Sequence, residues 1–217
     1  MTRLRTAILI SGRGSNMMAL VEAARRADYP AEIVAVVSNR PDAAGLGWAR
    51  DQGLAAIVVD HKAYPGREPF EGALHDVLVQ KRVELVCLAG FMRLMTRGFV
   101  ELWRDRMINI HPSLLPAYKG LDTHARVLKD GVRITGCTVH YVRAEMDDGP
   151  IIAQAAVAVA ATDTPELLAQ RVLAAEHRLY PHALAMVASG RARVAGEQVL
   201  RGPEPEPGAA LLSPPLA

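Results

Sequence analysis

The segment 106–120, RMINIHPSLLPAYKG, carries two hydrogen-bonding side chains at the end of a short apolar run. Asn109 and His111 are two residues apart, so in a β-strand their side chains lie on one face. An amide and an imidazole can both donate to an oxyanion, and the imidazole can also move a proton. Pro112 cannot continue a central strand, so it helps to fix His111 at the strand end. The pair indicates acyl-type chemistry; the alternative is that both side chains only satisfy loop backbone groups.

Three carboxylates lie in a later turn with the sequence AEMDDGP. Glu145, Asp147 and Asp148 are candidates to face His111, and a nearby carboxylate would keep its imidazole positively charged. Acidic turns are usually solvated, and Asp-Gly is common turn chemistry in itself. Sequence spacing does not decide between these two interpretations.

The first apolar run ends in SGRGSNMMAL, which resembles a loop that binds phosphate. Gly14 lets the backbone approach an anion, and Ser15 and Asn16 open a helix whose free N–H groups point at it. Met17 stands where a dinucleotide fingerprint needs its third glycine, and the ending of a Walker loop is missing. The remaining interpretations are a single phosphate on a small substrate and a tight strand-to-helix turn without a ligand.

The composition is that of an ordinary globular chain: 217 residues, 50% hydrophobic and 22% charged. The net charge is +2 and no basic block stands out, so neither nucleic acid nor a membrane surface is expected as a partner. The N-terminal apolar run is too short for a signal peptide. No stretch of about 18 apolar residues exists that would span a membrane.

The cysteines and histidines indicate neither a disulfide framework nor a metal site. Cys87 and Cys137 lie far apart without a CxxC motif, and Cys87 is expected to be a buried free thiol, which fits a reducing cytoplasm. Metal-ligand spacing is absent among the scattered histidines His61, His75, His177 and His182, so no metal is expected.

Strand-like runs alternate with helical segments through the first half of the chain. We expect strands at 6–11, 32–38, 55–60, 84–90 and 107–110, and helices at 16–27, 43–52, 71–81 and 97–103. The runs are continuously apolar, which is typical of strands covered on both faces, so the alternation predicts a parallel sheet with right-handed crossovers. Ligands bind beyond the carboxyl ends of such strands. The glycine loop, the GFMRLM segment and the Asn109–His111 pair should therefore meet at one edge.

The pattern changes after this half of the chain. A loop at 112–122 and a short helix at 123–130 precede two strand-like runs, 132–142 and 151–159, which are expected to pair at the edge of the sheet. A helix at 164–180 follows, with Thr164 as its N-cap. The predicted fold class is α/β: a Rossmann-like open sheet, mainly parallel, with antiparallel strands toward the C-terminal half and helices on both faces.

Six segments together resemble the phosphoribosylglycinamide formyltransferase family: ISGRGSN, VSNRPDAAGLGWA, LAGFMRLM, INIHPSLLPAYKGLDTH, GCTVHYV and DDGPIIAQ. The NIHPSLLP block is specific to the folate-dependent formyltransferase superfamily, and SGRGSN points to its glycinamide ribonucleotide branch. The resemblance implies that the amine of glycinamide ribonucleotide attacks the formyl carbon of 10-formyltetrahydrofolate. Formylglycinamide ribonucleotide and tetrahydrofolate result, a step of de novo purine biosynthesis.

The resemblance also implies roles for the residues that suggested acyl chemistry. Asn109 and His111 would hold the developing oxyanion, and protonated His111 would supply a proton toward the folate nitrogen that leaves. Asp147 would pair with His111, keep it cationic and help to order a water that relays protons.

The substrate-binding residues are implied in the same way. The ribose 5-phosphate would lie against Gly14, Ser15 and Asn16, and the glycinamide end of the nucleotide against Glu176. The folate site would consist of Arg67, Met92, Arg93, Leu94, Met95 and Asn109. The co-substrate would be 10-formyltetrahydrofolate, with no metal, and the partners would be these two small molecules, with no nucleic acid or membrane.

The resemblance predicts one cytoplasmic formyltransferase domain over residues 1–201, as a monomer or homodimer. Its nucleotide-binding half would span about 1–105 and its catalytic half about 106–201, with a disordered tail at 202–217. Asp122 departs from the family, which often has His there, and Arg13 lies at a variable position. His140 fits the family pattern and is expected to be structural rather than catalytic.

Other functions remain as alternatives to the implied one. Formyltetrahydrofolate hydrolase and methionyl-tRNA formyltransferase share the catalytic block, but a regulatory or RNA-binding domain is expected with them. A nucleotide-binding module without catalysis would not need Asn109, His111 and Asp147 together. A dehydrogenase would need an acidic residue after the second strand, where the sequence has VSNRP.

Overall fold

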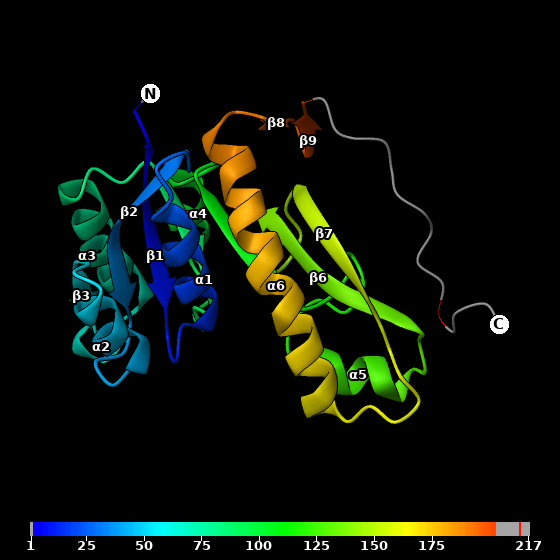
Figure 1. Cartoon of the computed structure of the whole chain (residues 1–217). Coiled ribbons are helices and arrows are strands. Elements are labelled where there is room, and N and C mark those ends of the chain that lie inside the picture. The colour runs from blue at the N-terminus through cyan, green and yellow to red at the C-terminus, as the bar shows by residue number, and fades with distance from the viewer. Residues whose placement is uncertain (1, 203–212, 214–217) are drawn as a thin grey trace.

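The main sheet of the described residues has seven strands and forms the centre of the fold (Figure 1). The computed structural model describes residues 2–202 and residue 213, so most of the predicted disordered tail lies outside the described residues. The strand order is β3-β2-β1-β4-β5-β6-β7. The bounds are Leu4–Ile10 (β1), Ala31–Ser38 (β2), Ala56–Val58 (β3), Leu85–Leu88 (β4), Met107–His111 (β5), Ile134–Tyr141 (β6) and Ile151–Ala158 (β7).

The direction of the strands changes at β5. Strands β1 to β5 pair in parallel, whereas β6 is antiparallel to β5 and β7 is antiparallel to β6. This arrangement confirms the predicted Rossmann-like sheet with antiparallel strands toward the C-terminal half. The register places His140 opposite Asn109 and Thr138 opposite His111. The two side chains predicted to do chemistry therefore have fixed cross-strand neighbours.

Helices cover both faces of the sheet (Figure 1). Their bounds in the described residues are Ser15–Ala24 (α1), Ala44–Asp51 (α2), Arg67–Gln80 (α3), Arg97–Leu102 (α4), Thr123–Lys129 (α5) and Pro165–Ala188 (α6), with a 3-10 helix at His61–Ala63 (η1). In β1, Ala7 and Leu9 pack with α3 and α4, whereas Ile8 and Ile10 pack with α1, α2 and α6. The continuous apolar runs thus reflect burial on both faces, as the sequence predicts.

Helix α6 is longer than predicted because it continues through Pro181. Its start agrees with the prediction, since the Thr164 hydroxyl accepts a hydrogen bond from a first-turn N–H at 3.3 Å. The predicted helix ends at residue 180, directly before Pro181, and a proline removes one helical donor. Tyr180 and Leu184 are both fully buried, so the packing of this face outweighs the lost hydrogen bond and the helix runs on to Ala188.

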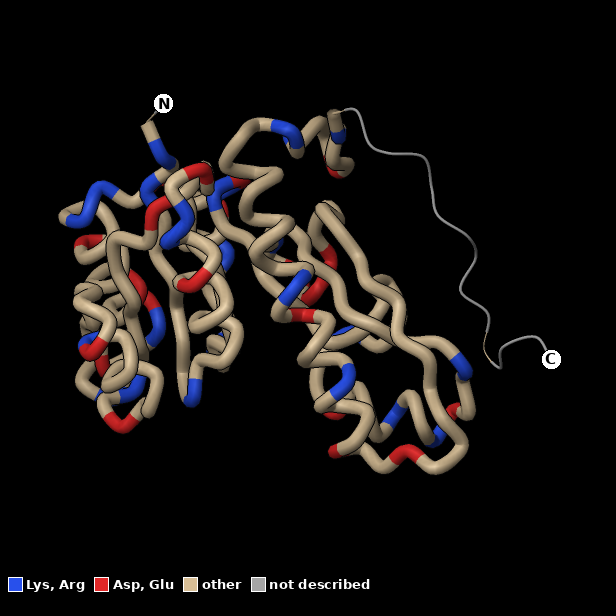
Figure 2. Tube along the Cα trace, in the orientation of Figure 1, with Lys and Arg blue, Asp and Glu red and all other residues tan. Residues whose placement is uncertain are grey.

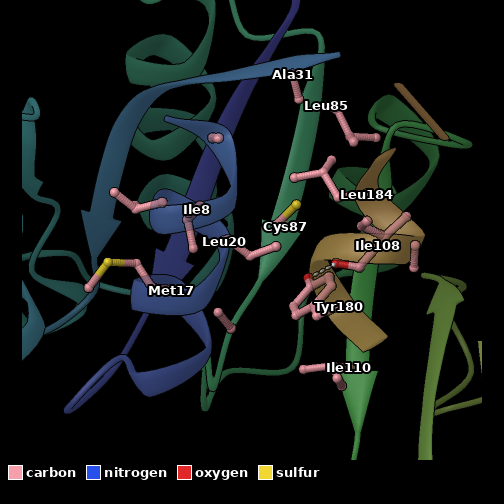
Figure 3. Close-up of a cluster of buried hydrophobic side chains, with 14 of the residues drawn as sticks. Ile8, Met17, Leu20, Ala31, Leu85, Cys87, Ile108, Ile110, Tyr180 and Leu184 are labelled. Carbon is pink, nitrogen blue, oxygen red and sulfur yellow. Dashed lines mark hydrogen bonds between the residues drawn. The ribbon is translucent and has the colours of Figure 1, made fainter. Parts of the chain in front are cut away.

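Tyr180 also ties α6 to the middle of the sheet (Figure 3). Its hydroxyl lies 3.0 Å from the carbonyl oxygen of Leu88 in β4 and 3.1 Å from that of Ile108 in β5. Cys87 lies in the same core as a buried free thiol, as predicted. One turn before Tyr180, the same helix carries Glu176, which is also buried. The position of this carboxylate is therefore set by the packing of α6 on β4 and β5.

A two-stranded hairpin, β8 (Ala192–Ala195) and β9 (Gln198–Arg201), follows α6 and was not predicted. Its turn residue Glu197 accepts hydrogen bonds from the guanidinium groups of Arg143 at 2.9 Å and Arg104 at 2.7 Å. These ion pairs attach the hairpin to the rest of the chain. They join residues far apart in sequence, which is why the sequence pattern did not indicate them.

Charged residues are spread over the described chain. Figure 2 shows Lys and Arg interspersed with Asp and Glu along the trace. Among the described residues, no helix combines the length and apolarity that crossing a membrane would require.

Gly136 in β6 offers a test of the packing between β6 and β7. A Cβ at this position would lie 1.9 Å from the backbone oxygen of Ala155, so we expect Gly136→Ala to lower the free energy of unfolding by about 2–3 kcal/mol. The matched control is Gly72→Ala on the exposed side of α3, where a Cβ meets nothing within 4 Å. That change should raise the stability by about 0.5–1 kcal/mol. Urea denaturation of both variants measures the difference, and equal stability of the two would contradict the register described here.

Candidate active site

The carboxyl end of β5 presents Asn109 and His111 on one face. His111 is 5% exposed, and Asn109 is half-buried. The next segment, 112–122, is held against the sheet by Thr138, whose hydroxyl donates to the Ser113 carbonyl at 2.7 Å and accepts from the Leu115 N–H at 3.0 Å. The loop after His111 is therefore fixed by the side chain directly opposite it on β6.

The imidazole of His111 lies between two hydrogen-bond acceptors. Its Nε2 is 2.9 Å from the carbonyl oxygen of Tyr118, and its Nδ1 is 3.3 Å from Oδ2 of Asp147. A carbonyl oxygen only accepts, so Nε2 must carry a proton. A proton on Nδ1 as well makes the ring cationic and pairs it with the carboxylate, which is largely buried. The ring is thus flanked by an acceptor at each nitrogen.

Asp147 reaches His111 from a strained turn between β6 and β7. Its φ is 53°, in the left-handed region that Asp tolerates better than most residues. Its Oδ2 also accepts the N–H of Gly120 at 2.9 Å, which joins the turn to the loop that follows β5. Gly149 has a different role from that expected of a turn glycine, because a Cβ there would lie 1.6 Å from the Tyr141 oxygen. The Asp-Gly sequence therefore serves close approach of two backbones.

The structure separates Asp147 from the other two candidate carboxylates. Glu145 pairs with Arg97 at 3.0 Å, and Asp148 pairs with Lys119, both at the surface. These two residues are therefore solvated surface carboxylates, as is usual in an acidic turn. Asp147 is the carboxylate that the fold brings to His111.

His140 is a neighbour of the site whose contacts the sequence did not reveal. Its Nδ1 is 2.9 Å from the carbonyl of Tyr141, so this nitrogen carries the proton. Burial lowers the pKa of His140, and the ring is therefore neutral with an unprotonated Nε2. The Nδ2 amide group of Asn109 lies 3.2 Å from that Nε2 and donates to it. His140 thereby sets which way the Asn109 amide points, a contact that depends on strand register.

The loop between β1 and α1 has the geometry of an anion site. Gly14 takes a left-handed conformation with φ 74°, and α1 begins at the next residue. The first N–H groups of a helix have no partners within the helix, so those of Ser15 and Asn16 are oriented to bind an anion. The side chain of Arg13 is exposed, so it faces solvent rather than the interior.

Asn16 and Glu176 meet in the interior although 160 positions separate them. Nδ2 of Asn16 donates to Oε2 of Glu176 at 2.7 Å, and both residues are less than 10% exposed. Burial raises the pKa of Glu176, and the hydrogen bond from Asn16 opposes that shift. The predicted nucleotide-binding residues of the two halves of the chain are thus brought together.

The 92–95 segment follows β4 at the same edge of the sheet. Met92 is 71% exposed and Leu94 is 62% exposed, so these large apolar side chains are available to a ligand. Arg67 lines a hollow of about 420 Å³ together with Thr96, the residue after this segment. Arg67 therefore lies near the segment with which the resemblance grouped it. In the described residues, no group of three or more His, Cys, Asp or Glu is placed to hold a metal ion.

The chain is similar to known formyltransferases in sequence and in fold. The family model described as Formyl transferase matches residues 4–184. Phosphoribosylglycinamide formyltransferase of Escherichia coli is 40% identical over 187 residues, covering 86% of this chain and 88% of that protein. The chain belongs to the phosphoribosylglycinamide formyltransferase family. Glycinamide ribonucleotide transformylase 1 of Symbiobacterium toebii has the same fold, with a TM-score of 0.89, 45% identity, and coverage of 92% and 94% of the two chains.

Some relatives of this formyltransferase family member are much longer. The trifunctional purine biosynthetic protein adenosine-3 of Gallus gallus is 49% identical over 192 residues, which are 88% of this chain but 19% of that protein. The chain thus spans about a fifth of the length of that relative. Asp122, where the resemblance implies His, is exposed and precedes α5 with a φ of 54°.

The state of His140 can be tested directly. Because burial lowers its pKa, the neutral ring should persist below the ordinary value of 6.5, with the proton on Nδ1. The unfolded chain takes up this proton at higher pH than the folded chain, so His140 makes stability fall as the pH drops below about 6.5. Nitrogen-15 spectra of the histidine rings between pH 7.5 and 5.5 report the protonation of both nitrogens. A His140 ring charged at pH 6.5 would contradict the assignment of the Asn109 amide.

Proposed function

We propose that the chain transfers the formyl group of 10-formyltetrahydrofolate to the amine of glycinamide ribonucleotide. The products are formylglycinamide ribonucleotide and tetrahydrofolate, and the step belongs to de novo purine biosynthesis. Membership of the family supports the proposal, as does the name of the Escherichia coli relative. The observation that carries it is the His111 imidazole, set between Asp147 and a backbone carbonyl beside Asn109 at the end of β5.

Asn109 and His111 supply donors to the oxygen that becomes negative when the amine attacks the formyl carbon. One amide N–H of Asn109 is engaged by His140, which leaves the second N–H for the substrate. The Nε2–H of His111 donates to the Tyr118 carbonyl, and the formyl oxygen would replace that carbonyl as the acceptor. A donor aimed at the developing charge stabilises it. The second Asn109 N–H can do so as it stands, whereas His111 must first exchange the Tyr118 carbonyl for the formyl oxygen.

The protons follow from the same arrangement. Attack forms a carbon–nitrogen bond to the amine, which then loses a proton, and collapse breaks the bond between the formyl carbon and the folate nitrogen. The leaving nitrogen gains a proton, and cationic His111 is the group placed to supply it. Asp147 keeps His111 charged and, through a water molecule, relays the proton from the amine.

The proposed nucleotide site contains residues from both halves of the chain. We assign the ribose 5-phosphate to the phosphate loop, defined as residues 12–16, with Gly14, Ser15 and Asn16 as its contacts. Glu176 is assigned to the glycinamide end, where its carboxylate faces an amine. Glu176 comes from the catalytic half, 106–201, and meets Asn16 of the nucleotide-binding half, 1–105, so both proposed halves contribute to one site.

The folate site is assigned to the folate loop, defined as residues 92–96, together with Asn109. Backbone groups of Met92, Arg93, Leu94 and Met95 would read the polar edge of the pterin. The exposed Met92 and Leu94 side chains offer flexible apolar surface to a flat heterocycle. Arg67, near the end of this loop, supplies a cation for the folate carboxylates.

A direct assay tests the proposal. The chain is mixed with 10-formyltetrahydrofolate and glycinamide ribonucleotide, or with 10-formyltetrahydrofolate and water alone, and the folate absorbance is followed. Turnover that requires the nucleotide supports formyl transfer. Equal turnover in water alone would identify a hydrolase instead.

Asp147→Asn tests the charge assigned to His111. Removal of the carboxylate charge should lower kcat by at least about 10²-fold, the usual size of one lost electrostatic contribution, with smaller changes in either KM. The matched control is Asp148→Asn, which removes a neighbouring carboxylate that pairs with Lys119 at the surface. It should retain activity within about twofold. Near-normal turnover of folded Asp147→Asn would refute the charge assignment.

Asn109→Ala and His111→Ala test whether both residues serve one oxygen. Asn109→Ala should lower kcat by about 10²–10³-fold, the usual cost of one oxyanion donor, and His111→Ala by at least as much. The double variant should lose less than the product of the two single losses, because the second donor has less to stabilise once the first is gone. Steady-state kinetics of the three variants measure this, and fully multiplicative losses would show that the residues act independently.

A further inference from the structure

Ser11 lies between the two proposed substrate sites and has no role in the reaction as described. It follows β1, directly before the phosphate loop, and is 6% exposed. Its backbone N–H donates to the carbonyl of Gly90 at 3.2 Å. Its hydroxyl oxygen accepts the N–H of Met92, the first residue of the folate loop, at 2.8 Å. One residue therefore contacts the segment after β4 through both its backbone and its side chain.

The direction of every hydrogen bond at Ser11 is fixed. A backbone N–H only donates, so the Ser11 oxygen accepts from Met92 and the hydroxyl proton goes to Oδ1 of Asn39 at 2.6 Å. Asn39 is 2% exposed, and its backbone oxygen lies 2.8 Å from Nδ1 of His61. The chain of bonds runs along the carboxyl ends of β2, β1 and β4. Ser11 and Asn39 are both buried, so a movement of Ser11 breaks its bond to the Met92 N–H and also removes its donor from the Asn39 amide oxygen.

We propose that Ser11 is a positioning residue that couples the phosphate loop to the folate loop, so that occupancy of the nucleotide site tightens folate binding. The inference rests on the proposed function for the identity of the two ligands. An anion at residues 12–16 orders the backbone next to Ser11, and the hydroxyl transmits that order to the N–H of Met92. Such coupling is reciprocal for binding, so bound folate raises the affinity for the nucleotide by the same factor.

The far end of the folate loop has a separate anchor. Glu71 of α3 is 4% exposed, and its carboxylate accepts from the N–H of Thr96 at 2.7 Å and also from the Thr96 hydroxyl. The folate loop is thus held at Met92 by Ser11 and at Thr96 by Glu71. The bonds described for Glu71 go to the folate loop and not to the phosphate loop. A change at Glu71 should therefore disturb the position of the folate loop without breaking its link to the phosphate loop.

The test measures binding rather than turnover. Titration calorimetry gives the Kd of tetrahydrofolate with and without saturating glycinamide ribonucleotide. In the wild-type chain the nucleotide should lower the Kd of tetrahydrofolate by about fivefold or more. Fivefold is the lower end of the range typical of coupled sites. Ser11→Ala should reduce that factor to below about twofold, and Ser11→Thr, which keeps the hydroxyl, should restore it. Ser11→Cys, with its weak hydrogen bonding, should also lose the coupling if Ser11→Ala folds poorly.

Two control variants separate coupling from general damage. Glu71→Gln should weaken the binding of tetrahydrofolate but keep the coupling factor of the wild-type chain. Ser38→Ala removes a fully buried hydroxyl that bonds with the backbone of Arg40, and it should change neither the affinity for tetrahydrofolate nor the coupling factor. Hydrogen exchange gives a second measurement, because the nucleotide should protect the Met92 amide in the wild-type chain and not in Ser11→Ala.

Four outcomes would overturn the inference. Wild-type binding of both ligands without coupling would do so while leaving the proposed function intact. Full coupling in folded Ser11→Ala or Ser11→Cys would do so too, as would equal loss of coupling in Glu71→Gln. A wild-type chain that binds neither ligand would overturn the proposed function and this inference together.

Discussion

The candidate site depends on the largely buried carboxylate of Asp147, whose side chain is 12% exposed. A carboxylate removed from water must be matched by donors and a positive charge, or it takes up a proton. Asp147 has partners in two separate segments: the Gly120 N–H at 2.9 Å and the His111 ring at 3.3 Å. Its need for partners therefore holds the turn before β7, the loop after β5 and the end of β5 in one arrangement.

The same carboxylate lies near two histidines with different surroundings. His111 faces Asp147 with one nitrogen and the Tyr118 carbonyl with the other. His140 is 3.8 Å from Asp147, is more deeply buried and has a lowered pKa, so it stays neutral. In the proposed reaction His111 supplies a proton, whereas the neutral His140 ring accepts from Asn109 and orients its amide.

The sequence predicted most of the sheet because the strands covered on both faces are continuous apolar runs, and the order of runs and helices determines a parallel arrangement. It did not predict the course of α6 beyond Pro181, where burial of Leu184 compensates for a missing hydrogen bond. It grouped Asn109 with His111 through the period of a strand. The choice of Asp147 over its acidic neighbours, and the contact between His140 and Asn109, arise from chain reversal and strand register, which no local pattern records.

The reversal of direction at β5 also explains why a glycine and a left-handed aspartate are found together. The β6–β7 connection leaves the sheet beside Met107 at the amino end of β5, where the Val142 N–H donates to its carbonyl at 2.9 Å. Asp147 nevertheless contacts His111 at the opposite end of that strand. The connection must fold back along the sheet, and Gly149 lets it pass directly over the end of β6 because a side chain there would overlap the Tyr141 carbonyl. The antiparallel half of the sheet thus delivers the carboxylate to an edge where the parallel strands present the other groups.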